Sequence, residues 1–431
     1  MEDLLRQRMV SAVAACRREW AVGLVLLFGL AVRVAWLFIA RPEPVSDFAG
    51  YLQAARNLMI PGGLVHTLRV FDIYYFPGTP VFLSLMLLIS QSQFWLSLGM
   101  VALSSLGAFL VWALALRLTG DRTVSLVACF VYAVLPHLVM FSSILATEHL
   151  FTVLMLMTLL FALRRTELRW GRAAFLGLVL GAAILTRGDG LFYLPVVLGV
   201  LYWFRREPRR KRVRNCAVML VALSLVVGAW YAKNAILFSP SVGLSGVSGL
   251  NLYYGHNPDH YGWWPESPLI GLPAMEANRL GFQLGLDYIR AHPASMFDSA
   301  AVGTRLLYSS STYAYYWSAF RAGDPATIVF EPRVIRGASV WYAIVDRASV
   351  AFLVLAALAA LSWPFWPSRL KFVVLGTVVT NWVGFTVVSH AKPRFRYFVD
   401  VILTIAVAFL AVRVARAFGR RVGDRATRRP Q

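Results

Sequence analysis

Cysteine is scarce in this chain, since only three of the 431 residues are cysteine, at Cys16, Cys129 and Cys216. No CxxC pair occurs, so the sequence lacks the disulfide framework of a small secreted domain. No P-loop, GxSxG, HExxH or dinucleotide-binding fingerprint stands in a credible context either. These absences argue against the nucleotide, serine-hydrolase and zinc-protease chemistries that such motifs support.

Acidic residues are also few, with 21 against 42 basic ones, which gives a net charge of +21. Such a charge would suit nucleic acid, but the basic residues gather in short connectors between apolar runs and alternate with connectors of mixed charge. The clusters are Arg6 to Arg18, Arg164 to Arg172, Arg205 to Arg214 and Arg413 to Arg429. This distribution indicates positive-inside membrane topology and contact with membrane lipids, and we predict no nucleic-acid partner.

Apolar residues make up 58% of the chain, and its mean hydropathy is +0.63. Runs of about 20 apolar residues recur from end to end, and each is long enough to cross the hydrocarbon core as a helix. The runs are continuous rather than alternating, which favours helices over a membrane β-barrel. We therefore predict an all-α polytopic membrane protein with about ten crossings.

The loop charges predict how the chain is divided. We expect a cytosolic N-terminus (1–19), a transmembrane core (20–232) that includes a first outer loop (41–76), an extracytoplasmic α-rich segment (233–340), C-terminal spans (341–415) and a basic cytosolic tail (416–431). Residues 77–91 should lie shallow or re-entrant while 94–117 cross, because two crossings there would turn every later arginine cluster outward. In the first outer loop, the sequence pattern predicts a short helix from Asp47 to Met59, capped by Ser46.

This topology places several chemically useful side chains on the external face. They are Asp47, Glu148, Arg187 with Asp189, and the basic segment from Lys392 to Tyr397. A carboxylate can deprotonate an acceptor hydroxyl, and cationic groups can hold a departing phosphate. The set therefore supports displacement at a sugar that carries a phospholipid leaving group, with Glu148 positioning the acceptor or binding a divalent cation.

Each of these residues also has a simpler interpretation. Asp47 could cap a loop helix, and the external arginines could snorkel to lipid headgroups. His256 and His260 have the spacing of metal ligands on a helix, but no clear third ligand accompanies them, so a divalent metal stays an open alternative. Asn381, inside an apolar run, could form an interhelical hydrogen bond without further function.

Short motifs occur in a recognisable order along the chain. They are Ser46-Asp47-Phe-Ala-Gly-Tyr51, Tyr75-Phe-Pro-Gly-Thr-Pro80, Ala146-Thr-Glu148-His-Leu-Phe151, Leu185-Thr-Arg187-Gly-Asp-Gly190, Gly255-His-Asn-Pro258 and His390-Ala-Lys-Pro-Arg394-Phe-Arg-Tyr397. On these motifs, the chain resembles bacterial GT-C glycosyltransferases of the protein O-mannosyltransferase and aminoarabinose transferase type (glycosyltransferase family 39-like). The resemblance covers most of the chain. It implies a GT-C bundle of about 10–12 transmembrane helices with juxtamembrane helices, in the bacterial cytoplasmic membrane.

The resemblance implies roles for individual residues. Asp47 matches the general base, and Glu148 matches the acid that assists at the acceptor or metal site. The residues expected at the lipid phosphate are Arg187, Lys392, Arg394, Arg396 and Tyr397, and those expected at the substrate are Tyr51, Tyr75, His256 and Asn257. Phe48 stands where some members have a second acid, and Gly50 and Phe76 stand where aminoarabinose transferases have basic residues. These departures argue against lipid A aminoarabinose transfer.

We therefore predict an inverting glycosyltransferase that moves a sugar from a polyprenyl phosphate to a protein, lipid or polysaccharide acceptor outside the membrane. The chief alternative is a secondary transporter or lipid flippase, which would carry charges mid-span on facing helices. A non-catalytic scaffold that binds a partner through its outer segment is a third interpretation. The enzyme hypothesis predicts that Asp47, Glu148 and Arg394 line one outward cavity that opens sideways to lipid.

Overall fold

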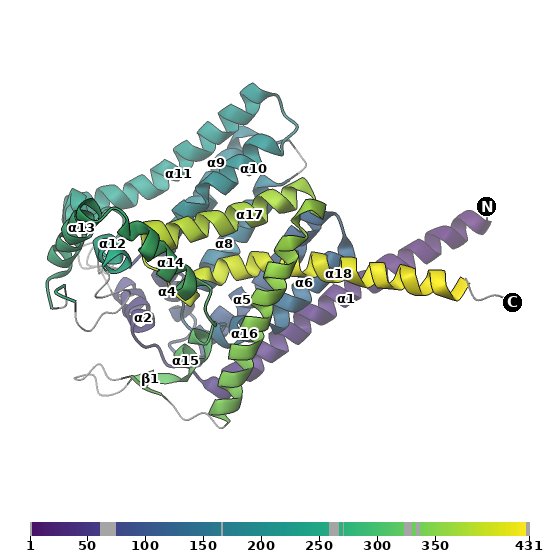
Figure 1. Cartoon of the computed structure of the whole chain (residues 1–431), viewed down its shortest axis with the longest axis horizontal. Helices are drawn as coiled ribbons and strands as arrows, with labels where there is room; N and C mark the ends of the chain where they lie inside the picture. The colour runs from purple at the N-terminus through teal and green to yellow at the C-terminus, as the bar shows by residue number, and fades with distance from the viewer. Residues whose placement is uncertain are drawn as a thin grey trace.

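The fold is an almost entirely helical bundle, and its N-terminal and C-terminal helices both project from the same end (Figure 1). The structure, a computed structural model, describes residues 2–60, 75–164, 167–257, 267–269, 271–322, 330–332 and 337–427. Much of the predicted first outer loop (61–74) and His260 lie outside the described residues.

In chain order the elements are α1 (Glu2–Ala40), α2 (Asp47–Leu58), α4 (Gly78–Leu87), α5 (Gln93–Thr119), α6 (Arg122–Val134), α7 (Pro136–Phe141), α8 (Thr147–Ala162), α9 (Trp170–Ile184), η1 (Gly188–Tyr193), α10 (Leu194–Trp203), α11 (Arg209–Leu237), η2 (Pro240–Val242), α12 (Ser248–His256), α13 (Ala274–Ala291), α14 (Ser295–Leu307), α15 (Tyr313–Ala319), β1 (Phe320–Ala322), β2 (Phe330–Pro332), α16 (Ala338–Leu361), η3 (Trp363–Phe365), α17 (Ser368–Val383), η4 (Gly384–Val388), η5 (Pro393–Arg396) and α18 (Tyr397–Thr427). The short antiparallel pair β1–β2 is the only sheet within the described ranges.

Six helical segments among the described residues are long and apolar enough to cross a membrane. They lie in α1, α5, α11, α16, α17 with η4, and η5 with α18. Shorter apolar helices, including α6, α8 and α9, pack among them. The predicted all-α polytopic class is confirmed.

The segment after the first outer loop forms two helices of very different length. α4 has 10 residues and α5 has 27. At about 1.5 Å per residue, α4 is too short to cross the hydrocarbon core, whereas α5 is long enough. These lengths agree with the predicted shallow segment followed by one full crossing.

Pro136 separates α6 from α7, and a buried arginine stabilises the break. Proline has no N–H to continue the helix, so carbonyl groups of the preceding turn are left without their usual donors. Arg33 of α1 donates to the carbonyl oxygens of Ala133 (2.8 Å) and Tyr132 (3.1 Å), and its Nε donates to Ser104 Oγ (3.0 Å). The charge of this fully buried arginine is thus placed at a helix C-terminus, where a cation is favourable.

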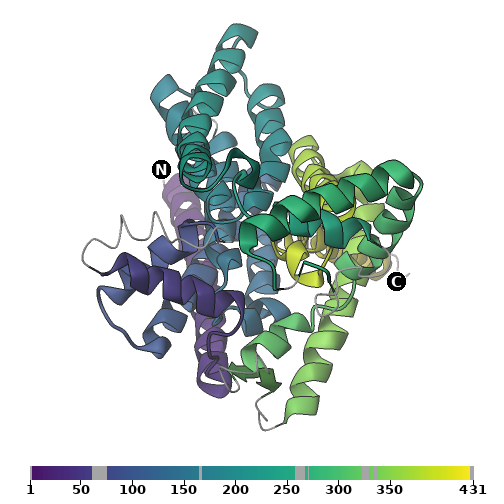
Figure 2. The same cartoon turned by 90° about the vertical axis from the view of Figure 1, so that its left-hand side faces the viewer.

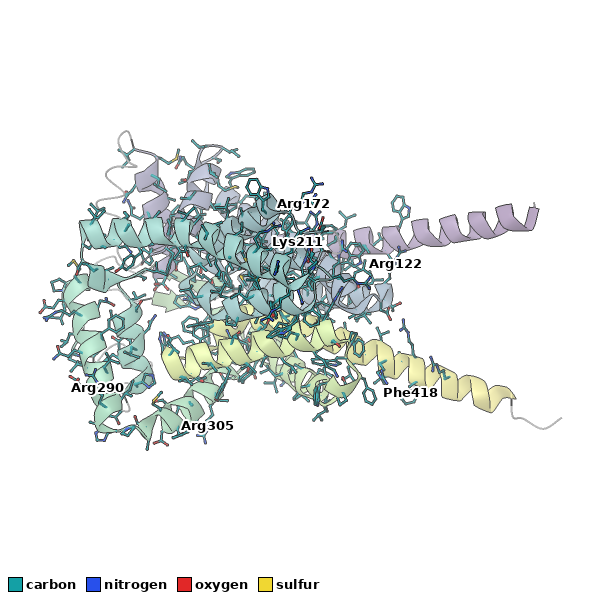
Figure 3. All side chains as sticks on the ribbon, turned by 90° about the horizontal axis from the view of Figure 1, so that it is seen from above. Arg122, Arg172, Lys211, Arg290, Arg305 and Phe418 are labelled. Atoms are coloured by element: carbon teal, nitrogen blue, oxygen red, sulfur yellow. The ribbon has the colours of Figure 1, made fainter. Side chains whose placement is uncertain are left out.

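The end of the bundle opposite the termini is covered by short helices. Viewed end-on, α2 and α13 lie across the bundle rather than along it (Figure 2). Arg290 of α13 and Arg305 of α14 lie at this end, whereas Arg122 and Phe418 lie toward the termini (Figure 3). α12, α13 and α14 all lie within the predicted α-rich segment (233–340). The assignment of 233–340 as a separate outer domain stays a prediction.

The predicted cap of α2 is wrong. The helix begins at Asp47, as expected, but Ser46 makes no side-chain capping hydrogen bond and has φ 53°. The first turn is closed by the backbone instead, since the Phe48 N–H donates to the Val45 carbonyl (3.1 Å) and the Ala49 N–H donates to the Ser46 carbonyl (3.1 Å). Asp47, in the first turn of the helix, is therefore free of a capping role.

Candidate active site

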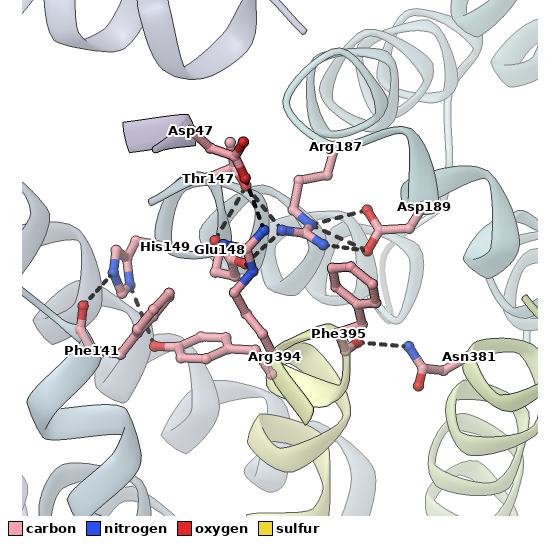
Figure 4. Close-up of polar contacts among 11 residues, drawn as sticks. Asp47, Phe141, Thr147, Glu148, His149, Arg187, Asp189, Asn381, Arg394 and Phe395 are labelled. Atoms are coloured by element: carbon pink, nitrogen blue, oxygen red, sulfur yellow. Dashed lines mark hydrogen bonds and ion pairs between the residues drawn. The ribbon is translucent and has the colours of Figure 1, made fainter. Parts of the chain in front are cut away.

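Four segments that are distant in sequence meet at the α2 end of the bundle (Figure 4). Asp47 stands in the first turn of α2, and Glu148 stands in the first turn of α8. A carboxylate is favourable at a helix N-terminus, because the helix dipole is positive there. Arg187 lies in the turn between α9 and η1, and Arg394 lies on η5. The structure thus places Asp47, Glu148, Arg187 and Arg394 together.

These side chains form a chain of alternating charge (Figure 4). Asp189 lies 3.1 Å from Arg187, and Arg187 lies 2.7 Å from Glu148. Arg394 then lies 3.3 Å from Glu148 and 3.3 Å from Asp47. Each arginine therefore contacts two carboxylates, which offsets the cost of burying its charge.

The two carboxylates beside Arg394 differ in access to solvent. The Asp47 side chain is 43% exposed, whereas that of Glu148 is 3% exposed. Arg394 lies between them and is 16% exposed. A substrate can therefore reach Asp47, while Glu148 is enclosed by protein.

The surroundings of Glu148 do not fit a divalent cation. Its Oε1 faces the guanidinium groups of both Arg187 and Arg394, and its Oε2 accepts a hydrogen bond from Thr147 Oγ1 (3.2 Å). A bound cation would face two positive charges at that position. Among the described residues, no group of three or more His, Cys, Asp or Glu could hold a metal ion.

The two arginines differ in the donors that they keep for a ligand. Arg187 donates from Nη1 to Thr147 and Glu148, and from Nε and Nη2 to Asp189. Burial would lower the pKa of Arg187, but Asp189 and Glu148 raise it above its ordinary value. Arg394 directs Nε to Glu148 and Nη2 to Asp47. Its Nη1 has no protein partner in the described part of the chain. Arg394 is thus the better placed of the two to receive an anion.

Lys392 adds a titratable cation beside this cluster. Burial, together with the charge of Arg394, lowers the pKa of Lys392 to about 8, although Asp47 opposes the change. Burial also lowers the pKa of His390 to about 3, helped by Lys392 and Arg394, so His390 is neutral at pH 7. The segment before η5 therefore presents an ammonium group that is readily deprotonated.

Two tyrosines pack beside Asp47. The rings of Tyr51 and Tyr75 meet edge to face with centroids 4.9 Å apart. Gly50 permits this approach, because a Cβ there would lie 2.4 Å from the Tyr75 ring. Burial, followed by the charge of Asp47, raises the pKa of Tyr51, so its phenol stays neutral. The two residues predicted to contact the substrate, Tyr51 and Tyr75, thus pack against each other near Asp47.

Arg396 and Tyr397 lie apart from the charged cluster. Arg396 is fully buried and donates to Asp400 (2.8 Å), to Ser311 Oγ (2.9 Å) and to the Leu307 carbonyl. The Tyr397 hydroxyl lies 3.3 Å from His149 Nδ1. In a 3₁₀ turn such as η5, residues two apart point in different directions. We therefore do not carry Arg396 or Tyr397 into the phosphate site proposed below.

His256 makes its hydrogen bond away from the charged cluster. The His256 ring is buried, and its Nε2 lies 2.8 Å from the Val387 carbonyl oxygen. Asn257 directly follows His256, the last residue of α12. Sequence reasoning missed the buried pair of His137 and Asp400, whose Nε2 and Oδ2 lie 3.1 Å apart, because each is a single polar residue in an apolar run.

A family model described as dolichyl-phosphate-mannose-protein mannosyltransferase matches residues 77–231. This range includes Glu148 and Arg187, but it includes neither Asp47 nor Arg394. No curated protein matches the chain by sequence.

Solved structures extend the comparison to nearly the whole chain. An oligosaccharyltransferase from Archaeoglobus fulgidus, AglB, in complex with an inhibitory peptide and a dolichol-phosphate, is similar with a TM-score of 0.51 and 12% identity, over 96% of this chain and 53% of that one. The apo form of the Archaeoglobus fulgidus oligosaccharyltransferase gives 0.52 and 13%, over 96% and 52%. ArnT from Cupriavidus metallidurans, bound to undecaprenyl phosphate, gives 0.38 and 15%, over 90% and 78%.

The chain thus spans about half the length of the archaeal structures that it matches, and at these identities the likeness concerns the fold alone. The shared fold and the family match confirm the resemblance predicted from the motifs. The protein is a multi-pass membrane protein with a fold similar to that of the archaeal oligosaccharyltransferase structures, and its residues 77–231 are similar to the dolichyl-phosphate-mannose-protein mannosyltransferases.

Proposed function

We propose that the protein transfers a sugar from a polyprenyl-phosphate donor to an acceptor hydroxyl on the extracytoplasmic side of the bacterial cytoplasmic membrane. The observation that carries this proposal is the exposed Asp47 carboxylate beside Arg394, which is in turn held by the enclosed Glu148. A base that substrate can reach thus lies next to a cation with an unused donor. The dolichol-phosphate in the similar archaeal structure supports a lipid-phosphate donor.

In the proposed reaction, Asp47 accepts the proton of the acceptor hydroxyl as its oxygen attacks the anomeric carbon. The bond between that carbon and the phosphate oxygen breaks, and polyprenyl phosphate leaves with the electron pair. Attack from the face opposite the phosphate inverts the anomeric configuration. Arg394, with Lys392, stabilises the negative charge that develops on the leaving phosphate.

Glu148 has a positioning role in this scheme. Its Oε1 contacts both Arg187 and Arg394, so it sets where the two guanidinium groups lie. It is too enclosed to meet an acceptor in this arrangement, since its side chain is 3% exposed. We therefore assign the base to Asp47 and not to Glu148.

A panel of radiolabelled polyprenyl-phosphate sugars, incubated with membranes that contain the protein, tests the proposal. We expect one sugar to leave its lipid carrier and appear on an acceptor. A flippase would move the labelled lipid between leaflets with the sugar still attached, and a scaffold would change neither. Either of those outcomes would reject the transferase.

Metal chelation is expected to leave the transfer rate within about twofold of the untreated value. The reason is that both guanidinium groups face the Glu148 carboxylate, where a cation would be repelled. The measurement is initial rate before and after EDTA, with added Mg²⁺ or Mn²⁺ as the control. A loss in EDTA that returns on adding either metal would contradict this account of Glu148.

Donor use is expected to weaken as pH rises through about 8. The pKa of Lys392 is lowered to about 8, so its ammonium is present below that pH and is lost above it. Losing one charge-assisted contact to the phosphate should lower kcat/KM for the donor about tenfold between roughly pH 7 and pH 10. Lys392→Arg should remove this descending limb, because arginine stays protonated. An unchanged limb in that variant would assign it to another group.

A further inference from the structure

Asn381 of α17 makes contact with two turns from a fully buried position. Its Nδ2 donates to the Tyr193 hydroxyl oxygen (2.8 Å) and to the Phe395 carbonyl oxygen (3.1 Å). Figure 4 shows the second of these bonds beside the charged cluster. One side-chain nitrogen therefore joins parts of the chain that are far apart in sequence.

The two acceptors belong to the two turns that carry the arginines. Tyr193 is the last residue of η1, the turn that begins directly after Arg187 and includes Asp189. Phe395 lies on η5, directly after Arg394. The Asn381 amide therefore connects the turn that presents Arg187 to the turn that presents Arg394.

The Phe395 side chain strengthens this connection. Its ring centroid lies 5.9 Å from the Arg187 guanidinium carbon and 5.8 Å from that of Arg394. The ring also stacks on Phe385 with centroids 4.7 Å apart. Fixing the Phe395 backbone thus fixes a ring that contacts both cations, in addition to the turn itself.

Asparagine suits this place because its amide nitrogen carries two hydrogens. Serine could donate only one hydrogen bond, and leucine, of similar size, none. The Asn381 Oδ1 has no hydrogen-bond partner within the described ranges, so the amide is held through its nitrogen. The amide of Asn381 therefore donates its two hydrogen bonds to the two turns next to the arginines, and it does more than link two helices.

We propose that Asn381 is a positioning residue that sets the spacing between Arg187 and Arg394, and so shapes the site for the leaving phosphate. This inference rests on the proposed function. In the proposed reaction Arg394 stabilises charge that develops in the transition state, so a small displacement of its guanidinium relative to Arg187 should lower kcat more than it raises the donor KM.

The test compares Asn381→Leu with Tyr193→Phe and with Thr380→Val. Leucine removes both bonds, and phenylalanine removes only the acceptor on η1. Thr380 is the neighbouring residue, and its hydroxyl donates to the Gly376 carbonyl within the same helix (2.8 Å), so its loss is a matched control. We expect kcat to fall about 10- to 100-fold in Asn381→Leu and less in Tyr193→Phe. Thr380→Val should keep the wild-type kcat.

A double-mutant cycle separates positioning from a general effect on folding. In an Arg394→Gln background, Asn381→Leu should lower kcat by less than threefold, since the group that it positions is already gone. If the full loss recurs in that background, or if Asn381→Leu alone keeps the wild-type kcat while Arg394→Gln loses it, the positioning role is rejected and the proposed function stands. Wild-type kcat together with a wild-type donor KM in Arg394→Gln would instead reject the proposed function.

Discussion

Replacing Asp47 with asparagine is expected to lower the turnover of sugar transfer by about 10²- to 10⁴-fold, the range that a positioned general base contributes. Asparagine keeps the shape of the side chain but accepts no proton from the acceptor hydroxyl. The fold should persist, because the Asp47 side chain is 43% exposed and caps no helix. The measurement is kcat of the purified variant, with its melting temperature as a check on folding.

Asp287→Asn is a suitable control for this experiment. Asp287 is an acid on α13, at the same end of the bundle, and it forms an exposed ion pair with Arg290 (3.3 Å). Its replacement should leave kcat unchanged, because exposed pairs contribute little. Wild-type kcat in a folded Asp47→Asn protein would show that Asp47 is not the general base.

Replacing Arg394 with glutamine is expected to lower kcat by about 10²- to 10³-fold, the usual effect of deleting one donor to a developing negative charge. Arg394 contacts both Asp47 and Glu148 and keeps Nη1 for the phosphate. Its loss therefore removes a cation from the leaving group and also releases the base from its ion pair. The measurement is kcat and the donor KM, determined separately.

Lysine at position 394 should recover only part of the activity, because an ammonium group cannot hold two carboxylates and a phosphate as the planar guanidinium does. Arg290→Gln, on α13, is the matched control and should behave as wild type, since Arg290 is 73% exposed. A higher donor KM with unchanged kcat in Arg394→Gln would show that Arg394 only binds the donor in its ground state.

Much of the site could be predicted because membrane topology restricts where side chains can lie. Hydropathy predicted the spans, and the arginine clusters predicted which connectors share a face. Asp47 and Arg394 are 347 residues apart in sequence, yet each was assigned to an external connector, and the structure joins them. Distance along the sequence therefore does not predict that these two residues meet, whereas the charges of the connectors do.

The sequence could not separate Arg394 from Arg396. Both stand in one short basic segment, and both were expected at the phosphate. The difference arises because η5 is a 3₁₀ turn, which directs Arg394 to the carboxylates and Arg396 into the protein, where it pairs with Asp400. The direction of a side chain on a turn depends on where the turn begins, and composition does not show this.

The connection through Asn381 was equally hidden. A lone asparagine in an apolar run predicts a hydrogen bond between helices but identifies no partner. Tyr193 lies 188 residues away, and its hydroxyl has no sequence pattern that pairs it with an amide. Such long-range pairs depend on helix packing, which hydropathy does not determine.

Sugar transfer with inversion is tested by the fate of the donor sugar in liposomes that contain only the purified protein, a polyprenyl-phosphate sugar and an acceptor. We expect one polyprenyl phosphate to be released for each product formed, and the anomeric configuration of the product to be opposite to that of the donor. A product of retained configuration, or a sugar that remains on its lipid after crossing the bilayer, would contradict it.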